Sequence, residues 1–221
     1  MGRTTGVISL AVAVLALSVA RPAHAEPSDE RLVLTGLAMA PPMYLVGVTM
    51  HEGSHAVAAK LMGATIDEIR LFPPGIDPKI DKFRFGWVYV RGLRGRNAKI
   101  FMYLAPKITD AIFLSAYTAL YFTDSLPDNK YGQLALLVGA TGFWVDFAKD
   151  VVLTSRHNDV VKAFHLWCMR GWKQAAPRLL YAAIDVGFAY VIARGYQKLF
   201  SDGTQQSSQP VMTLPLVSAT F

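Results

Sequence analysis

The chain has 221 residues, of which 52% are hydrophobic and only 17% are charged. Soluble domains carry about a quarter charged residues, so this composition indicates one membrane domain and no second soluble domain. The net charge of +6 comes from basic residues beside apolar segments. The positive-inside bias of membrane proteins explains that pattern better than nucleic-acid binding does. The single cysteine, Cys168, excludes an internal disulfide and a cysteine-rich metal site.

Residues 1–25 have the pattern of a secretory signal. Arg3 provides the basic start, an apolar run extends from Val7 to Ala20, and Ala23-His24-Ala25 fits a cleavage motif. The alternative is an uncleaved anchor helix, but this apolar run is short for a full membrane span. We therefore expect cleavage before Glu26 and a mature N-terminus outside the cell.

The first mature membrane segment extends from about Leu32 to Met62. Pro41 and Pro42 predict a break or kink in it, because proline lacks the backbone N–H and clashes with the preceding turn. A helix that restarts near Met43 would carry residues 51–55 at its middle. These five residues read His-Glu-Gly-Ser-His, which is the HExxH pattern of zinc metallopeptidases.

The HExxH spacing predicts a metal site. On a helix, His51 and His55 lie one turn apart on the same face, where two neutral imidazoles can hold one Zn²⁺. Glu52 would then lie beside a water molecule that the metal polarises, and could act as general base. Placing two histidines and a glutamate in an apolar helix costs free energy unless these side chains have a binding partner. The setting therefore favours a metal site over a helix with two solvent-facing histidines.

The stretch 64–99 does not resemble a membrane segment. Residues 66–72 and 83–90 have strand-like composition, and Pro73-Pro74-Gly75 separates them, which predicts a β-hairpin or small sheet near the site. The connection is also basic, which predicts a cytoplasmic location; its basic residues are Arg70, Lys79, Lys82, Arg84, Arg91, Arg94, Arg96 and Lys99.

Three further spans are predicted over about 100–122, 131–153 and 179–196. The acidic loop 124–129 belongs outside and the basic segment 154–178 inside, as four spans that start outside require. The predicted fold is thus an all-α polytopic membrane protein of about four transmembrane helices, with a small β-hairpin insertion after the HExxH helix. The membrane domain covers residues 26–200, and residues 201–221 form a polar, flexible tail.

Within the inner segment, Val160, Val161, Phe164 and Trp167 recur at helical spacing and predict an amphipathic helix. Trp167 and Trp172 suit the level of lipid headgroups, so the helix would lie at the membrane interface. The alternative is an ordinary amphipathic helix packed on the domain.

A catalytic zinc takes three protein ligands, and two aspartates compete for the third place. Asp146 lies about 10 Å from the inner end of the span 131–153, at 1.5 Å per residue. Asp159 lies beyond this span, so the chain would have to fold back to bring it to the histidines. Depth therefore ranks Asp146 first and Asp159 second. An aspartate within a predicted span could instead form an ion pair with Lys107 or Lys149, and we favour this interpretation for Asp150.

These motifs resemble the site-2-protease clan of integral-membrane zinc peptidases. Residues 51–63 are similar to the clan's motif helix, with Ser54 where a glycine is usual, and residues 71–75 with 85–86 resemble the hairpin that follows it. Residues 105–110 occupy the place of a Gly-Pro…Asn element, with Asp110 at the Asn position. The resemblance implies that Asp110 orients the substrate.

The clan's third ligand lies in a Leu-Asp-Gly motif, which this chain lacks. By the order of spans, Trp144-Val145-Asp146 takes the corresponding place. A divergent subgroup instead has an Asp-rich turn followed by a Ser-Asp-Ala-like element, which Asp146, Asp150 and His157-Asn158-Asp159 resemble. Both aspartates therefore stay candidates.

The resemblance implies an intramembrane zinc endopeptidase that cleaves a membrane protein or peptide substrate. It would act in a lipid bilayer, such as a bacterial inner membrane, with Zn²⁺ as cofactor. One alternative is a non-catalytic relative that binds a partner helix, and another is a membrane metal-binding protein. A hydroxylase or desaturase would need more histidines than this chain has. Neither the substrate nor the oligomeric state can be predicted.

Overall fold

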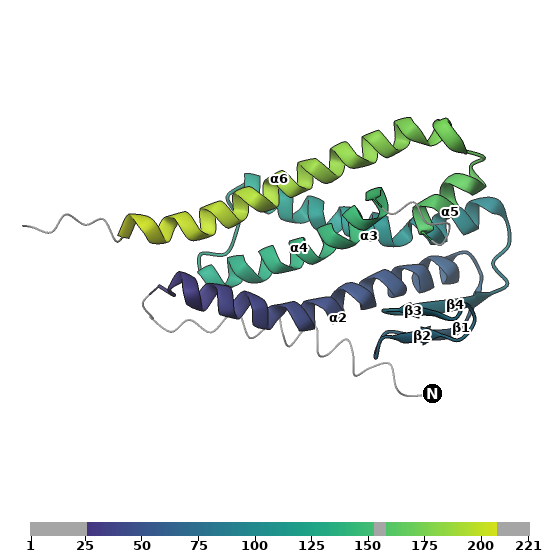
Figure 1. Cartoon of the computed structure of the whole chain (residues 1–221), viewed down its shortest axis with the longest axis horizontal. Coiled ribbons are helices and arrows are strands. Elements are labelled where there is room, and N and C mark those ends of the chain that lie inside the picture. Colours follow the sequence, from purple (N-terminus) through teal and green to yellow (C-terminus); the bar gives the residue numbers. More distant parts are fainter. Residues whose placement is uncertain (1–25, 153–157, 207–221) are drawn as a thin grey trace, which may run out of the picture.

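The computed structural model describes residues 26–152 and 158–206. The predicted signal, His157 and the tail beyond residue 206 lie outside the described residues. In the described part, four long helices run side by side along the long axis of the molecule (Figure 1). They are α2 (Asp29–Leu61), α3 (Arg96–Phe122), α4 (Lys130–Val152) and α6 (Ala175–Gln206), with α5 (Asp159–Leu166) and the 3₁₀ helix η1 (Gly171–Gln174) between α4 and α6.

Helix α2 continues through both prolines. The predicted break near Met43 is therefore wrong, because Pro41 and Pro42 lie inside one uninterrupted helix. Each proline removes a backbone hydrogen bond, but α2 packs on α4 on both sides of the pair: Gly36 lies against Leu134, and the Met43 side chain lies over Gly139. Packing against neighbouring helices is what allows prolines within membrane helices. The helix ends before Gly63, whose φ of 78° is a left-handed conformation that glycine adopts readily.

A small β insertion connects α2 to α3. Strand β1 (Thr65–Arg70) pairs antiparallel with β4 (Trp87–Arg91), and the shorter β2 (Gly75–Asp77) pairs with β3 (Lys82–Arg84) between them. Gly86 brings this insertion against α2, because a Cβ there would lie 2.8 Å from Val48 and 3.0 Å from the Glu52 side chain. The insertion thus borders the HExxH motif.

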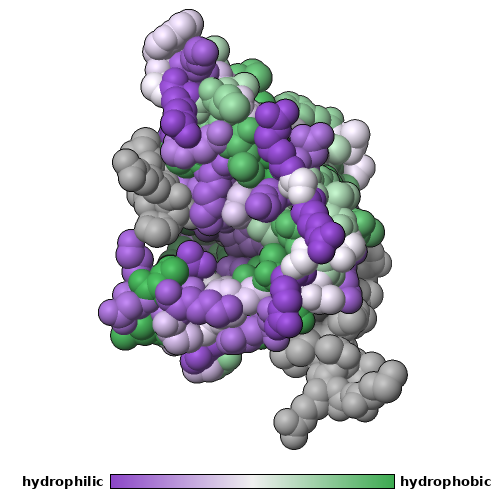
Figure 2. Space-filling view, turned by 90° about the vertical axis from the view of Figure 1, so that its right-hand side faces the viewer, coloured by the Kyte–Doolittle hydropathy of each residue, from purple (hydrophilic) through white to green (hydrophobic). Residues whose placement is uncertain are grey.

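The two ends of the molecule are formed by different elements. At one end the loop after α3 lies beside the start of α2, where Lys130 pairs with Glu26 at 3.1 Å, and Asp124 pairs with Lys198 of α6 at 2.7 Å. The β insertion, α5 and the start of α6 lie at the opposite end (Figure 1). Figure 2 looks onto that opposite end and shows hydrophilic side chains over most of it.

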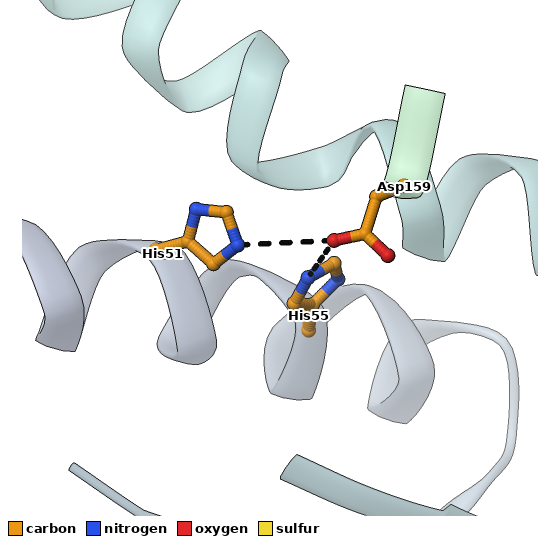
Figure 3. A group of neighbouring side chains, drawn as sticks. All are labelled: His51, His55 and Asp159. Atoms are coloured by element: carbon orange, nitrogen blue, oxygen red, sulfur yellow. Dashed lines mark hydrogen bonds and ion pairs between the residues drawn. The ribbon is translucent and has the colours of Figure 1, made fainter. Parts of the chain in front are cut away.

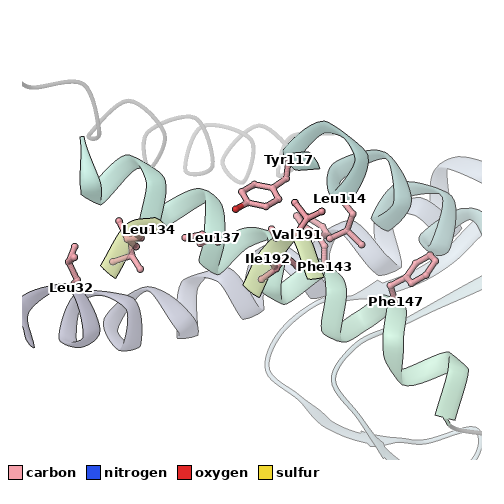
Figure 4. Packing of buried hydrophobic residues seen from close by; sticks show 11 residues of the cluster. Leu32, Leu114, Tyr117, Leu134, Leu137, Phe143, Phe147, Val191 and Ile192 are labelled. Carbon is pink, nitrogen blue, oxygen red and sulfur yellow. The ribbon is translucent and has the colours of Figure 1, made fainter. Parts of the chain in front are cut away.

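The main hydrophobic core lies among α3, α4 and α6 (Figure 4), with Leu32 of α2 at its margin. Helix α4 contacts both α2 and α6. Among the described residues, two helical segments, 29–61 and 171–201, are long and apolar enough to cross a membrane. Large apolar side chains also face outward on α6; Val186 is 66% exposed. These features support a membrane protein.

Gly195 of α6 allows the closest contact in this core. A Cβ at this position would collide with the Tyr117 hydroxyl and lie 2.8 Å from Leu137. We expect Gly195→Ala to destabilise the protein by about 1–3 kcal/mol, as overpacking does. Thermal unfolding in detergent measures the effect. Tyr117→Phe in the same chain should recover part of it, because the buried Tyr117 hydroxyl has no hydrogen-bond partner among the described residues.

Gly187 provides the matched control on the same helix. A Cβ there meets no atom within 4 Å, so Gly187→Ala should leave the unfolding midpoint unchanged or slightly higher. Equal effects of the two alanine substitutions would contradict the packing described here.

Candidate metal centre

His51 and His55 face the same side of α2, as the HExxH spacing predicts. Their ring centroids lie 5.1 Å apart in an edge-on arrangement, and both rings are turned toward α5 (Figure 3). His55 is buried, with 6% of its surface exposed. Ordinary helix geometry therefore brings the two imidazoles together before any distant residue contributes.

A hydrogen bond on Nδ1 orients each imidazole. His51 Nδ1 lies 2.8 Å from Asp146 Oδ2, and His55 Nδ1 donates to the Met102 carbonyl at 2.7 Å. With the proton on Nδ1, the Nε2 atom of a neutral ring carries a free lone pair. Metal-binding histidines characteristically have such a partner on the second nitrogen.

Asp159 completes a group of three ligand atoms with the two histidines. Its Oδ2 atom lies 3.2 Å from His55 Nε2 and 3.8 Å from His51 Nε2, as Figure 3 shows. One ligand atom from each residue lies within 4.8 Å of the others. This carboxylate at the start of α5 therefore reaches the histidines of α2, although it lies beyond the end of α4 in sequence.

Local contacts hold Asp159 in place at the start of α5. The Asn158 side chain caps the helix by accepting from the Val161 N–H at 3.1 Å. The same side chain donates to Asp150 of α4 at 2.6 Å. The apolar face of α5 is buried, and the helix packs on α3. The structure thus shows α5 packed on α3, and its position relative to a membrane interface stays a prediction.

The chemistry of this group fits a bound cation. Two Nε2 atoms and a carboxylate oxygen are all acceptors, so their lone pairs repel one another unless a proton or a metal ion lies between them. Tetrahedral Zn²⁺ with bonds of about 2.0–2.1 Å separates its ligand atoms by about 3.3 Å, which is close to the observed 3.2 and 3.8 Å. Two nitrogens and one oxygen also form a common ligand set of catalytic zinc.

The surroundings of Asp159 lower the pKa of its carboxyl. Burial raises this pKa, but hydrogen bonds from the His51 and His55 rings, when the facing nitrogens carry a proton, and the Lys162 ammonium outweigh the burial. The pKa is therefore held well below its usual range, so this carboxylate is available to bind a metal.

Asp146 lies on the other side of His51, at Nδ1, rather than among the converging Nε2 atoms. Its carboxylate also contacts Lys107 and Lys149. The depth argument ranked Asp146 above Asp159, whereas the geometry favours Asp159. Depth alone could not identify the third ligand, because it ignored which ring nitrogen each carboxylate faces.

Lys107 forms a buried charge cluster behind the histidines. Only 5% of its side chain is exposed, and its ammonium lies 3.1 Å from Asp110, 2.7 Å from Asp146 and 3.1 Å from Asp150. The ion pair considered for Asp150 is thus present. Asp110 is 3% exposed, contacts Lys107 and does not line the cavity beside the histidines.

A cavity of about 1110 Å³ opens beside the site. His51, Glu52 and Asp159 line it at one end, and from there it extends between the apolar faces of α2 and α4. Glu52 is partly buried, with its side chain against Gly86. The general-base candidate therefore faces the same space as the three candidate ligands. Its lining includes apolar residues of both helices: Leu37, Met43, Val138 and Val145.

Sequence reasoning missed two contacts of this site. The Met102 carbonyl that orients His55 carries no side-chain signal. The Ser54 hydroxyl is hydrogen-bonded to the Thr109 hydroxyl of α3 at 2.7 Å. From the sequence, Ser54 was noted only as a departure from the usual glycine. Both contacts connect α2 to α3, so neither could be found before the two helices were packed together.

Comparison with known families agrees with the motif. The family described as Peptidase M50B-like matches residues 7–123, more than half of the chain. This match confirms the resemblance to the site-2-protease clan. It includes the HExxH motif and ends before Asp146 and Asp159, so it does not bear on the third ligand. No curated protein and no solved structure matches the chain.

Zinc content distinguishes the two aspartates. Asp159→Asn should remove stoichiometric zinc, because an amide oxygen is a poor replacement for the carboxylate ligand. Asp146→Asn keeps an acceptor for His51 Nδ1 and should weaken zinc binding by only about 10–100-fold. Elemental analysis of the purified full-length protein measures both, with His55→Ala as the zinc-free reference. The opposite pattern would assign the third ligand to Asp146.

Removal of the Lys107 ammonium should destabilise the bundle. Lys107→Met leaves three carboxylates without their shared cation, which we expect to cost about 3–5 kcal/mol. Asp150→Asn in the same chain should recover part of that loss, because it removes one of the uncompensated charges. Thermal unfolding in detergent measures both effects. Lys60→Met, at an exposed position of α2, is the control, and an equally small effect of Lys107→Met would refute the role of the cluster.

Proposed function

The chain belongs to the Peptidase M50B-like family, and on that basis we propose that it is an intramembrane zinc endopeptidase. Its substrate would be a peptide bond of a membrane-associated protein. The observation that carries this proposal is the convergence of His51 Nε2, His55 Nε2 and the Asp159 carboxylate beside Glu52. The alternatives from sequence, a non-catalytic partner-binding protein and a metal-binding carrier, do not call for a base at that position.

In this proposal His51, His55 and Asp159 hold the zinc ion. A zinc ion bound there would polarise the scissile carbonyl and lower the pKa of a water molecule. Asp146 and the Met102 carbonyl keep each imidazole in the tautomer that presents Nε2. We propose a structural role for Asp110, as a partner of the Lys107 ammonium, in place of the substrate-orienting role implied by the resemblance.

Glu52 would transfer the proton. Its carboxylate accepts a proton from the attacking water as the new carbon–oxygen bond forms. It then donates that proton to the amine nitrogen as the carbon–nitrogen bond breaks. The position of Glu52 supports both steps, because it lines the same cavity as His51, His55 and Asp159.

The cavity suits an apolar substrate segment. Between α2 and α4 its walls are apolar, and at its inner end they become charged. A substrate helix entering this space must unwind near the site, because the carbonyl of a helical amide already accepts a hydrogen bond. Membrane protein substrates are therefore favoured over soluble peptides.

We further propose that α2, α3, α4 and α6 all cross the membrane. At about 1.5 Å per residue, His51 lies about 15 Å from the end of α2, and thus within the bilayer. The basic end that carries the β insertion and α5 would face the cytoplasm, and the acidic end would face outward. A bacterial inner membrane and a cleaved signal over residues 1–25 complete this proposal.

Glu52→Gln tests catalysis without disturbing the ligands. Cleavage should fall by about 10²–10⁴-fold, the usual contribution of a general base, while zinc content stays at the wild-type level. The measurement is fragment analysis by mass spectrometry after the full-length protein is reconstituted with single-span membrane proteins. Glu30→Gln, at an exposed position of the same helix, should leave cleavage unchanged.

Two outcomes would favour the alternatives. Zinc retention with function unaffected by Glu52→Gln would indicate a metal carrier or sensor. A wild-type protein without zinc, whose function also tolerates Glu52→Gln, would indicate a partner-binding relative.

A further inference from the structure

A second cavity, of about 840 Å³, lies at the basic end of the molecule. It is formed where α5, η1 and the start of α6 meet, and it shares no lining residue with the cavity beside the histidines. Three of its lining side chains are Arg170, Arg178 and His165. The remaining lining residues are uncharged: Val161, Gly171, Gln174 and Ala175.

The lining of this cavity contains basic residues and no acidic residue among those described. The sequence has no aspartate or glutamate from residue 160 to residue 184. Within the described part of the chain, neither Arg170 nor Arg178 forms an ion pair with an acid. Arg178 donates to the Gln174 side chain at 3.2 Å and lies over the Phe164 ring. The two guanidinium groups therefore have no anionic partner among the described residues, and the cavity suits an anion.

The cavity also adjoins a surface suited to lipid. Immediately after Arg178, Leu179 is 71% exposed and Leu180 is 65% exposed. Trp172 in η1 is 84% exposed, and tryptophan favours the boundary between acyl chains and headgroups. An apolar helix face thus begins one residue beyond a guanidinium group. In a membrane, this arrangement would set the cavity at headgroup level, with acyl chains beside it.

We propose that this cavity binds the headgroup phosphate of an anionic phospholipid of the inner leaflet. Guanidinium groups pair with phosphate oxygens through two parallel N–H donors. Basic pockets beside membrane helices on the cytoplasmic side commonly bind anionic headgroups. A zwitterionic headgroup brings its own ammonium, which the positive charge of the cavity disfavours. The proposal requires a membrane-embedded chain but no peptidase activity.

Lipid binding to the full-length protein tests the assignment. The protein in detergent is titrated with dioleoylphosphatidylglycerol or dioleoylphosphatidylcholine, and bound lipid is measured by native mass spectrometry. Phosphatidylglycerol should bind about tenfold more tightly, and Arg170→Gln or Arg178→Gln should each weaken it about fivefold, as loss of one basic contact predicts. Lys173→Gln is the matched control, because Lys173 lies in η1 but does not line the cavity.

Three results would overturn the proposal. Equal binding of the two lipids would remove the preference for an anion. A loss with Lys173→Gln as large as with Arg170→Gln would indicate only diffuse surface charge. Displacement of phosphatidylglycerol by millimolar inorganic phosphate would indicate a site for free anions. If Arg178→Gln lowers the thermal unfolding midpoint, Arg170→Gln decides, because the Arg170 side chain forms no hydrogen bond, ion pair or ring contact with a described residue.

Discussion

Lys107 places an ammonium group inside the bundle, and three carboxylates gather around it. A buried cation of this kind is tolerated only when its charge is compensated at close range. Asp110 supplies compensation from the same helix, and Asp146 and Asp150 supply it from α4. The cluster therefore connects α3 to α4. Since Asp146 also bonds to His51, the same charges orient one of the two histidines on α2.

The candidate metal centre and the second cavity, which Arg170 and Arg178 line and which we call the basic cavity, lie at opposite ends of one short helix. Asp159 begins α5 and faces the histidines, while His165 near its end lines the basic cavity. The buried side of α5 packs on α3, so contacts within the protein position this helix. This position explains how a residue beyond the end of α4 can reach the two histidines of α2.

Much of the architecture follows from local sequence. The predicted spans over 100–122 and 131–153 agree closely with α3 and α4, because apolar runs bounded by charged loops define such helices directly. The fourth helix is longer than its apolar run, extending from Ala175 to Gln206. Pro41 and Pro42 of α2 led to a wrong prediction of a break, because a propensity rule based on isolated helices omits the contacts with α4 on both sides of the pair.

The sequence by itself identified His51, Glu52 and His55 as candidate site residues and predicted that the two histidines share one helix face. Residues four apart lie on the same face of any α-helix. Only the tertiary structure favours Asp159 over Asp146 as the third ligand. Both are acids at plausible depth, and the difference lies in which ring nitrogen each one faces. That distinction depends on the buried Lys107 and on the packing of α5 against α3, and both are long-range contacts that no local pattern in the sequence encodes.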